Sequence, residues 1–291
     1  MSHSRYFAGR DEKNEEKLAH LLATLPPYCK DYFRGIRPAT TSMTRVAYAY
    51  DLSMFFTFLR NSPDASLRAI CEAKRPECLS AITKQDVECY LEYLEGNGAS
   101  PDDGPRNRTQ GIRRRFSSLK SFLSYFCEAK AIPVNPTDAT RMPKLREKEI
   151  IRMDQDEMRE FLTELENGTG LRGKEIAYHG RFQVRDKAML SLMLGTGIRV
   201  SECVGLDLED IDLTKNSAHI QRKGGREATV YYNDEVKENL RVYLEERTGQ
   251  QAASGHESAL FLSRERRRIS VRGVEYLVKK YASVRSEERR V

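Results

Sequence analysis

Apolar side chains recur at helical spacing through the first half of the chain, and this periodicity limits the fold more than any other feature. In a segment that starts near Ser42, and again in the segment that begins at Thr83, apolar residues follow one another at steps of three and four, which places them on one face of a helix. The residues expected to face inward are Tyr48, Leu52, Phe55, Phe56 and Leu59 in the first segment and Val87, Tyr90, Leu91 and Leu94 in the second. No alternating pattern typical of strands competes with them, so the first half is predicted to be helical.

The longest predicted helix, over residues 109–129, combines an apolar face with a basic one. Its apolar face carries Ile112, Phe116, Leu119, Leu123 and Phe126. Arg113, Arg114 and Arg115 stand near its start. The preceding sequence NGASPDDGPRNR, residues 97–108, is rich in turn-forming residues and is predicted to be an exposed loop.

The boundary between two domains is predicted where the helical periodicity stops. Three prolines and several charges occur between residues 133 and 152 without sustained periodicity, which is typical of a linker. We therefore divide the chain into an N-terminal arm (1–25), a helical domain (26–135), a linker (136–152) and a second domain (153–291).

Helices dominate the second domain too, with one exception. In the segment Ser217–Asn233, the runs SAHIQ and ATVYY flank the turn-forming sequence KGGRE, which predicts a β-hairpin. Asp234 is predicted to cap the next helix, and the last helix is predicted to start at Ser270. The predicted fold class is mainly α with two domains, of which the second is mixed α+β with a small antiparallel sheet.

Composition narrows the function classes only partly. The 49 Lys and Arg residues against 43 Asp and Glu give a net charge of +6, which suits a polyanionic partner but also fits many other proteins. No segment approaches the roughly 18 apolar residues of a membrane helix, and the first residues lack the apolar centre of a secretion signal, so a cytoplasmic protein is expected. The six cysteines and five histidines are dispersed, so we expect reduced, mostly buried thiols and no metal site.

The most informative segment is the end of an apolar run, AMLSLMLGTG, where Gly195 and Gly197 are followed at once by Arg199. Glycines at a helix end let the backbone approach a ligand closely. An arginine there suits a phosphate, because its planar fork donates two parallel hydrogen bonds and stays charged at any working pH. Glu202, three residues on, could hold that fork in place. The simpler alternative is a surface ion pair between Arg199 and Glu202.

A second candidate is Lys223, which stands at the tip of the predicted hairpin and is followed by Gly224 and Gly225. A hairpin tip can insert a lysine into a groove and place its ammonium near a leaving oxygen. The alternative is a solvated lysine in a glycine-containing turn, which is the usual case for a lysine taken alone.

Together these segments resemble a known family. The sequence GTGIRVSECVGLDLEDIDL, followed by a strand and QRKGGREATVYYN, resembles the catalytic domain of tyrosine recombinases (the phage integrase family), in particular Xer-like bacterial integrases. The first half is similar to the family's core-binding domain, with TTSMTRVAYAYDLSMFFTFLRN, ITKQDVECYLEYL and RRRFSSLKSFLSYF in the same order. FLSRERRRISVRGVEYLVKKY is similar to the helix before the family's second catalytic cluster. The resemblance extends over residues 28–283.

The resemblance implies a fold and a mechanism. It implies a SAM-like helical core-binding domain at residues 26–135 and a catalytic domain at residues 153–291. In the family, a tyrosine attacks a DNA phosphate to give a 3′-phosphotyrosyl link while a lysine protonates the leaving 5′-oxygen. Arg199 and Lys223 would then be catalytic, with Glu202 in support. The implied partner is double-stranded DNA, and no metal or other cofactor is implied.

The family's second catalytic cluster has no counterpart in the printed sequence. It consists of a His-x-x-Arg on a helix, then a His or Trp, then the tyrosine nucleophile, whereas this sequence ends in VRSEERRV. The His-x-x-Arg string that begins at His219 lies on a predicted strand before Lys223, and Tyr281 lies on the apolar face of its helix, where core packing explains it better than catalysis. We therefore expect a catalytic domain truncated before its nucleophile, and a chain unable to cleave DNA alone.

Two hypotheses follow from that expectation. The leading one is a recombinase represented by an incomplete copy, which would be a gene fragment, a frameshifted relic or a shortened expression product. The alternative is a non-catalytic DNA-binding protein that occupies recombination sites or modulates a full-length relative. An out-of-frame His-x-x-Arg and tyrosine in the DNA downstream of the Val291 codon would favour the first.

Basic residues outside the catalytic set are candidates for contact with DNA phosphates. The candidates are Arg113, Arg114, Arg115 and Lys120 on the long helix, and Arg267 with its neighbours Arg264, Arg266 and Arg268. For each of them a solvated surface position is an equal alternative. Complete relatives act as tetramers on two duplexes, so the resemblance also implies a homo-oligomer.

Overall fold

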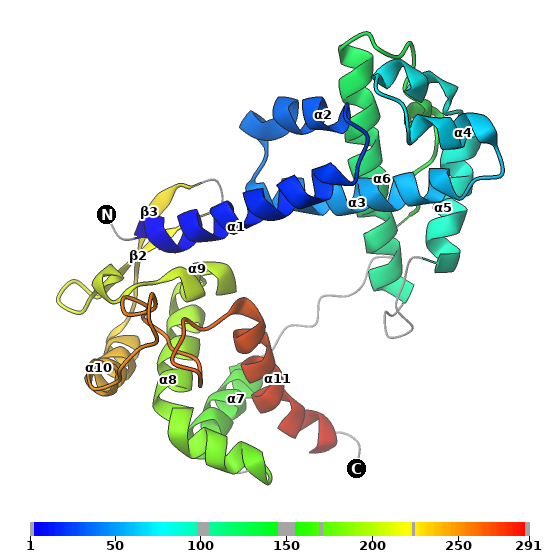
Figure 1. The fold of residues 1–291 in the computed structure, drawn as a ribbon. Coiled ribbons are helices and arrows are strands. Elements are labelled where there is room, and N and C mark those ends of the chain that lie inside the picture. Colours follow the sequence, from blue (N-terminus) through cyan, green and yellow to red (C-terminus); the bar gives the residue numbers. More distant parts are fainter. Residues whose placement is uncertain (1–2, 98–104, 145–154, 169–170, 223–224, 289–291) are drawn as a thin grey trace. The chain divides into compact units, whose positions relative to one another are not determined.

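The chain divides into two compact units (Figure 1). A computed structural model describes residues 3–97, 105–144, 155–168, 171–222 and 225–288. The N-terminal unit is Gly9–Glu149, and the C-terminal unit combines Met1–Ala8 with Ile150–Val291. The division after Glu149 falls inside the predicted linker, whereas the predicted arm 1–25 is shared between the two units.

Helices make up the secondary structure of the N-terminal unit across its described residues. They are α1 (His3–Ala23, in this unit from Gly9), α2 (Cys29–Ile36), η1 (Arg37–Ala39), α3 (Ser42–Arg60), α4 (Ala65–Ile70), η2 (Pro76–Ala81), α5 (Lys84–Asn97), α6 (Pro105–Glu128) and η3 (Pro136–Ala139). Pro136 and Thr137 of η3 are buried, so the first residues of the predicted linker belong to this unit.

The core of the N-terminal unit is aromatic and centres on Phe122 of α6. Its ring lies 5.2 Å from that of Tyr32 and 5.2 Å from that of Phe126, both edge-to-face, and 6.1 Å from Phe56 of α3. Edge-to-face pairs add to the stability that burial provides, because the positive ring edge meets the negative ring face. The apolar faces predicted for α3 and α6 therefore meet at Phe122, and most of the residues predicted to face inward are buried.

The starts of the helices follow the capping rules. Thr41 caps α3 by accepting the Thr44 N–H, and Thr83 and Asp86 form a reciprocal capping box before α5. The predicted loop 97–108 is wrong in its last part, because α6 already begins at Pro105. Proline is favoured in the first helical position, where its missing N–H costs no hydrogen bond.

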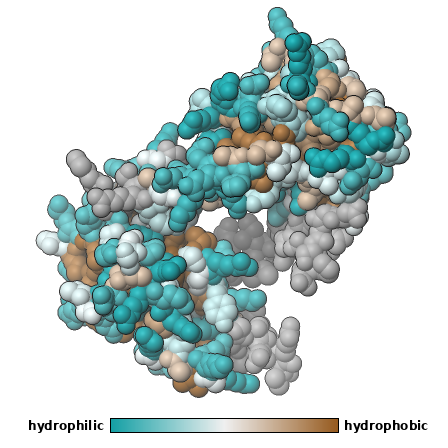
Figure 2. Space-filling model, in the orientation of Figure 1, coloured by the Kyte–Doolittle hydropathy of each residue, from teal (hydrophilic) through white to brown (hydrophobic). Residues whose placement is uncertain are grey.

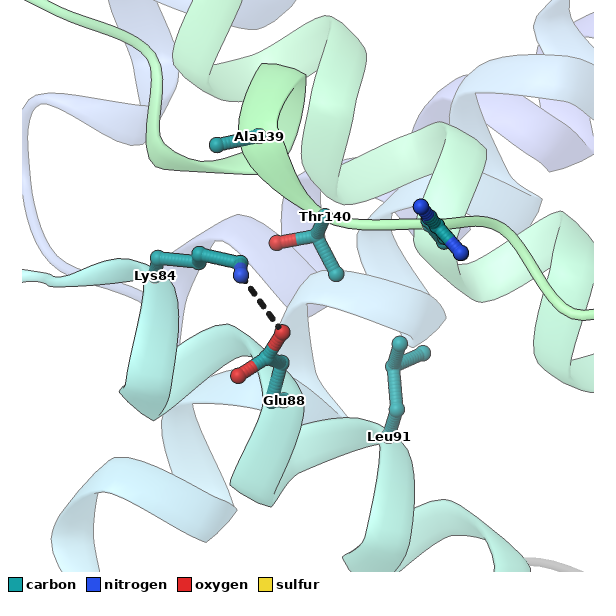
Figure 3. Close-up of a pocket in the computed structure, with 6 residues that line it drawn as sticks. Lys84, Glu88, Leu91, Ala139 and Thr140 are labelled. Atoms are coloured by element: carbon teal, nitrogen blue, oxygen red, sulfur yellow. Dashed lines mark ion pairs between the residues drawn. The ribbon is translucent and has the colours of Figure 1, made fainter.

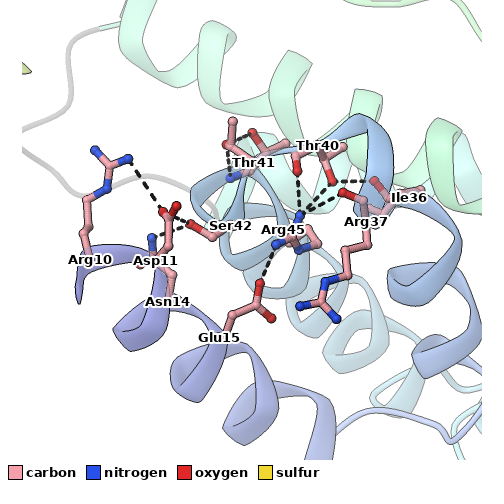
Figure 4. A network of polar contacts seen from close by, with 11 residues as sticks. Arg10, Asp11, Asn14, Glu15, Ile36, Arg37, Thr40, Thr41, Ser42 and Arg45 are labelled. Atoms are coloured by element: carbon pink, nitrogen blue, oxygen red, sulfur yellow. Dashed lines mark hydrogen bonds and ion pairs between the residues drawn. The ribbon is translucent and has the colours of Figure 1, made fainter. Parts of the chain in front are cut away.

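A buried arginine, Arg45, joins three segments of the N-terminal unit (Figure 4). Its Nη1 donates to the carbonyl of Thr40 at 2.6 Å, and its Nη2 forms an ion pair with Glu15 of α1. Beside it, Ser42 donates to Asp11 of α1 at 2.6 Å. These contacts attach the part of α1 that follows Gly9 to the start of α3.

The C-terminal unit is mixed α+β, as predicted. Its described elements after the first residues are α7 (Gln155–Asn167), α8 (Lys174–Thr196), α9 (Val200–Gly205), η4 (Leu208–Asp210), β1 (Ile211–Asp212), β2 (Ser217–Gln221), β3 (Glu227–Tyr231), α10 (Asp234–Thr248) and α11 (Val271–Glu288). The strands form an antiparallel sheet in the order β1-β2-β3, and His219 pairs with Thr229 across the predicted hairpin. The predicted fold class, mainly helical with a small antiparallel sheet, is confirmed.

Two local predictions for the sequence are corrected here. Asn233, not Asp234, caps α10, because its side chain accepts the Val236 N–H at 3.0 Å. Asp234 is the first helical residue and accepts a hydrogen bond from Asn216 instead.

All six cysteine thiols are free, but only Cys29 and Cys203 are buried. Across the described residues, no helix combines the length and apolar character needed to cross a membrane.

Asp210 lies at the centre of a buried acidic turn in the C-terminal unit. Its Oδ2 accepts the backbone N–H of Asp207 at 2.6 Å, and Asp207 in turn accepts from Ser258 at 2.9 Å and pairs with Arg268. Burial raises the pKa of Asp210 to about 7, and the neighbouring carboxylates of Asp207 and Glu209 act in the same direction. The folded protein therefore binds a proton here that an unfolded aspartate releases at much lower pH.

Replacing this carboxyl group should change how stability depends on pH. Protonation of Asp210 stabilises the fold fully below the unfolded pKa of about 3.9, and that contribution is lost as the pH rises through about 7. Asp210→Asn keeps the accepting oxygen and stays neutral, so its stability relative to the parent should increase from about pH 5 to pH 8, by at most about 1.4 kcal/mol for each unit of pKa shift. Urea unfolding at several pH values measures this.

Asp212→Asn is the matched control. A hydrogen bond from the backbone N–H of Lys215 lowers the pKa of the partly exposed Asp212, so the effect of this variant on stability should be constant over the same pH range. An equally constant difference for Asp210→Asn would contradict the assignment.

Candidate functional site

The end of α8 has the backbone geometry expected of its glycines. Gly197 adopts a left-handed conformation (φ 68°, ψ 17°), and its N–H donates to the carbonyl of Met193 at 2.9 Å, which closes the helix. A Cβ at Gly195 would lie 2.8 Å from Cγ2 of Val236, so the absence of a side chain lets α8 pack closely against α10. The chain then turns at once into α9.

Arg199 is the N-cap residue of α9, and Glu202 holds it in two ways. One carboxylate oxygen of Glu202 accepts the Arg199 backbone N–H at 2.9 Å, and the other accepts a guanidinium hydrogen bond from Nη1 at 3.0 Å. Glu202 is 5% exposed, whereas the Arg199 side chain is 71% exposed. The buried carboxylate therefore orients a guanidinium whose other donors face solvent, an arrangement that can bind an anion.

Lys223, the second predicted catalytic residue, lies outside the described residues, together with Gly224. The hairpin that carries it is described up to its flanks, where the Arg222 N–H donates to the carbonyl of Arg226 at 2.7 Å. Gly225 has a positive φ of 78°, as a tight turn requires. The pairing of Arg199 with Lys223 at one phosphate stays a prediction.

His219 begins the string that matched His-x-x-Arg. It is exposed on β2, and its Nδ1 lies 3.1 Å from the hydroxyl of Thr229 on β3. This is a cross-strand contact on the surface of the sheet.

The two late tyrosines have different surroundings on α11. Tyr276 is 67% exposed, whereas Tyr281 is buried. The Tyr281 hydroxyl lies 2.9 Å from Nδ1 of His179 and donates to Oδ2 of Asp186 at 3.3 Å. Burial raises the pKa of Tyr281 well above its ordinary value, and Asp186 adds to this effect, so the phenolate needed for nucleophilic attack is disfavoured.

Asp186 is the centre of a buried polar cluster that the sequence analysis missed. Arg185 donates to its Oδ1 through Nε at 2.9 Å and through Nη2 at 2.5 Å, and also donates to the carbonyl of Leu262 at 2.6 Å. Lys280 of α11 lies 3.7 Å from Oδ2, and burial lowers the pKa of this lysine. The cluster joins α8, α11 and the segment around Leu262, but no pattern in the sequence relates these segments to one another.

The basic run at residues 264–268 contains arginines with different environments. Arg268 is almost fully engaged: it donates to the carbonyls of Leu206 at 2.6 Å and Val204 at 3.1 Å, and pairs with Asp207. It therefore holds the end of α9 in place. Arg267 is exposed, as are its neighbours Arg264 and Arg266.

Four basic residues of α6 contact other residues of the N-terminal unit, namely Arg113, Arg114, Arg115 and Lys120. Arg114 donates to Asp51 at 2.5 Å, and Arg115 lies 3.9 Å from the same carboxylate. Arg113 donates to the carbonyl of Pro143 at 2.5 Å, and Lys120 lies 2.8 Å from Asp138. Arg114 and Lys120 are nevertheless about half exposed, at 48% and 47% of their side chains.

A pocket of about 400 Å³ in the N-terminal unit lies between α5 and the residues at and after the end of η3 (Figure 3). It is lined by Lys84, Glu88, Leu91, Ala139, Thr140 and Arg141. Lys84 and Glu88 form an ion pair at 3.2 Å across one turn of the helix, so these two opposite charges compensate each other. The pocket contains none of the predicted site residues.

The face of each unit that Figure 2 shows is mostly polar. Figure 2 shows hydrophilic side chains over most of the visible face of each unit, with hydrophobic residues in smaller patches. Among the described residues, no group of three or more His, Cys, Asp or Glu side chains is placed to hold a metal ion. The candidate site is therefore assigned on Arg199, Glu202 and the exposed basic residues.

Comparisons with known proteins decide the family. The model of the phage integrase family matches residues 151–290. Tyrosine recombinase XerC of Caldanaerobacter subterraneus subsp. tengcongensis is 31% identical over 267 residues, which cover 88% of this chain and 68% of that protein. This chain belongs to the tyrosine recombinase family. Tyrosine recombinase XerS of Streptococcus agalactiae is 28% identical over 293 residues, which cover 92% of this chain and 81% of that protein.

Solved structures agree with the recombinase fold. A structure of the Tn1549 transposon integrase in complex with transposon right end DNA has a TM-score of 0.61 at 16% identity, over 88% of this chain and 79% of that one. A lambda integrase dimer bound to a COC′ core site has a TM-score of 0.59 at 15% identity, over 89% of this chain and 77% of that one. The family resemblance predicted from the sequence is confirmed by the family model and the recombinase relatives, and these structures agree in fold.

In this recombinase-family chain, Tyr281 should behave as a core residue. Tyr281→Phe removes a hydroxyl that contacts His179 and Asp186, so we expect the free energy of unfolding to fall by about 1–2 kcal/mol. Tyr276→Phe changes an exposed side chain and should stay within about 0.5 kcal/mol of the parent. Urea unfolding of both variants tests this, and equal stabilities would contradict the structural role of Tyr281.

Proposed function

We propose that this protein acts in site-specific DNA recombination, in which DNA strands are cut and rejoined through a 3′-phosphotyrosyl intermediate, and that the polypeptide 1–291 binds the DNA but does not cleave it alone. The observation that carries the proposal is the exposed Arg199 guanidinium, oriented by the buried Glu202 at the glycine-terminated end of α8. Family membership supports the same function, because the matched relatives are named tyrosine recombinases.

The chemistry requires fixed positive donors around one phosphate. A phosphodiester is a poor electrophile unless the negative charge that develops on its non-bridging oxygens is stabilised, and pre-oriented donors do this without reorganising during the reaction. Arg199 would supply two such donors, with Glu202 holding the plane of its guanidinium. Lys223 would protonate the leaving 5′-oxygen as general acid.

Duplex DNA is the proposed partner. Lambda integrase is described bound to a DNA core site, and the Tn1549 integrase in complex with transposon end DNA. On this chain, the half-exposed Arg114 and Lys120 and the exposed Arg267 are the best placed of the predicted phosphate contacts. Arg115 and Arg268 are mostly covered, so we assign them to supporting roles.

Assembly and location are also proposals. A lambda integrase tetramer is described bound to a Holliday junction, and a homo-oligomer on two duplexes is proposed here by analogy. Because the substrate would be DNA, we propose that the protein acts in the cytoplasm, where bacterial DNA is located.

A finer proposal concerns the nucleophile. Tyr281 is buried and hydrogen-bonded, and Tyr276 has no His-x-x-Arg before it on a helix, so we propose that neither attacks DNA. On this view the polypeptide 1–291 alone binds DNA without cleaving it. The alternative function, a non-catalytic protein that occupies recombination sites, would rest on the same observation.

Binding to DNA should depend steeply on salt. Each phosphate neutralised by a lysine or arginine releases counterions, so the logarithm of the binding constant should fall by about 0.9 per contact for each unit of log salt concentration. Fluorescence anisotropy with a mixed-sequence duplex, from about 50 to about 200 mM salt, measures this slope. Arg267→Ala should reduce the slope by about 0.9. Binding that is undetectable or independent of salt would contradict the proposed function.

The polypeptide should form no covalent link to DNA. Incubation with a nicked suicide substrate, which traps phosphotyrosyl intermediates, is expected to give no adduct on a denaturing gel, because neither late tyrosine is placed to attack. A tyrosine recombinase that forms the phosphotyrosyl link, run in parallel, controls for the substrate. An adduct that maps to Tyr276 or Tyr281 by mass spectrometry would overturn the assignment of both tyrosines.

A further inference from the structure

A buried carboxylate on α3, Asp51, faces two arginines of α6. The Asp51 side chain is 2% exposed. Its Oδ2 accepts from the hydroxyl of Ser118 at 2.7 Å and from Nη1 of Arg114 at 2.5 Å, and its Oδ1 lies 3.9 Å from Nε of Arg115. Within this cluster, one carboxylate thus faces two guanidinium groups.

Arg114 and Arg115 differ in what they can reach. The Arg115 side chain is 18% exposed, whereas that of Arg114 is 48% exposed. Both described contacts of Arg114, with Asp51 and with the carbonyl of Ala47 at 3.5 Å, use Nη1. Because the guanidinium is planar and carries five N–H donors, holding Nη1 fixes the direction of the Nε and Nη2 donors as well.

We propose that Asp51 is a positioning residue for DNA binding, which holds Arg114 so that its remaining donors meet one backbone phosphate. Arg115 balances the buried charge, and Ser118 occupies a further lone pair of the carboxylate. The inference rests on the proposed function, since it concerns how this chain holds duplex DNA. An arginine that is ordered before binding loses less conformational freedom on contact, so the contact is tighter.

Two simpler explanations give different expectations for Asp51→Asn. If Asp51 only joins α3 to α6, the variant changes stability but leaves DNA binding unchanged. If only total charge matters, removing a negative charge raises the attraction to phosphates and binding becomes tighter. If Asp51 positions Arg114, the variant binds DNA more weakly although its charge is more positive. The direction of the change in affinity therefore distinguishes the three explanations.

The experiment measures affinity and salt slope for the full chain on a fluorescent mixed-sequence duplex. Asp51→Asn is expected to bind roughly threefold to tenfold more weakly than the parent, the cost of immobilising one long side chain on contact. Arg114→Ala should reduce the salt slope by about 0.9, the value for one phosphate. In the Arg114→Ala background, Asp51→Asn should cause no further weakening, because Asp51 acts through Arg114.

Two further variants complete the design. Asp31→Asn makes the same charge change at an exposed pair with Arg34, 3.3 Å apart, and should bind as tightly as the parent or slightly more tightly. Arg114→Lys keeps the charge but loses the planar fork, so it should bind more weakly with an unchanged salt slope. Arg114→Lys also carries the test if circular dichroism shows that Asp51→Asn does not fold.

The outcomes are distinguishable. If Asp51→Asn binds as tightly as the parent or more tightly, or if Arg114→Lys binds like the parent, the positioning role is overturned while the proposed function stands. If the parent chain shows no salt-dependent binding at all, both fail.

Discussion

A buried carboxylate that holds an exposed arginine is the interaction on which the proposed function depends. Glu202 holds Arg199 in the C-terminal unit, and Asp51 holds Arg114 in the N-terminal unit. Burying a carboxylate costs free energy unless hydrogen-bond donors, above all charged ones, compensate it. Each buried carboxylate therefore favours the conformation in which its arginine is bound to it. The same requirement fixes the plane of the guanidinium, and its outward donors acquire a defined direction. An exposed arginine without such a partner would have to be ordered by the DNA itself, at the expense of affinity.

The same kind of pair also works inward, where it builds the fold instead of a binding surface. Arg185 donates hydrogen bonds to Asp186 and to the carbonyl of Leu262. Arg268 pairs with Asp207 and donates to the carbonyls at the end of α9. The side chains of Arg185 and Arg268 are only 4% and 8% exposed, so a phosphate cannot reach them easily. What distinguishes the two classes is therefore the exposure of the side chain and the number of donors already used, not the charge of the surrounding sequence.

Much of the fold could be predicted because it follows from local sequence. Apolar residues at a period of 3.6 predicted the helices, and two strand-forming runs on either side of a turn sequence predicted the hairpin. Each of these patterns lies within a short stretch of sequence. The errors are also local. Pro105 starts α6 inside a segment rich in turn formers, because proline suits both a turn and a first helical position. Asn233 and Asp234 are both good capping residues and adjacent, so composition could not choose between them.

The candidate site shows the limit of such reasoning. Arg199 and Glu202 are three residues apart, so their contact could be anticipated from the sequence and is present. Asp51 and Arg114 are 63 residues apart, and no single-sequence pattern pairs a carboxylate on one helix with a particular arginine in a run of three on another. That choice is made by tertiary packing, which places the α3 carboxylate against one side of α6. A basic run in a sequence thus indicates that a nucleic acid could bind. The buried carboxylates that contact the run in the folded structure identify which of its arginines have a fixed orientation.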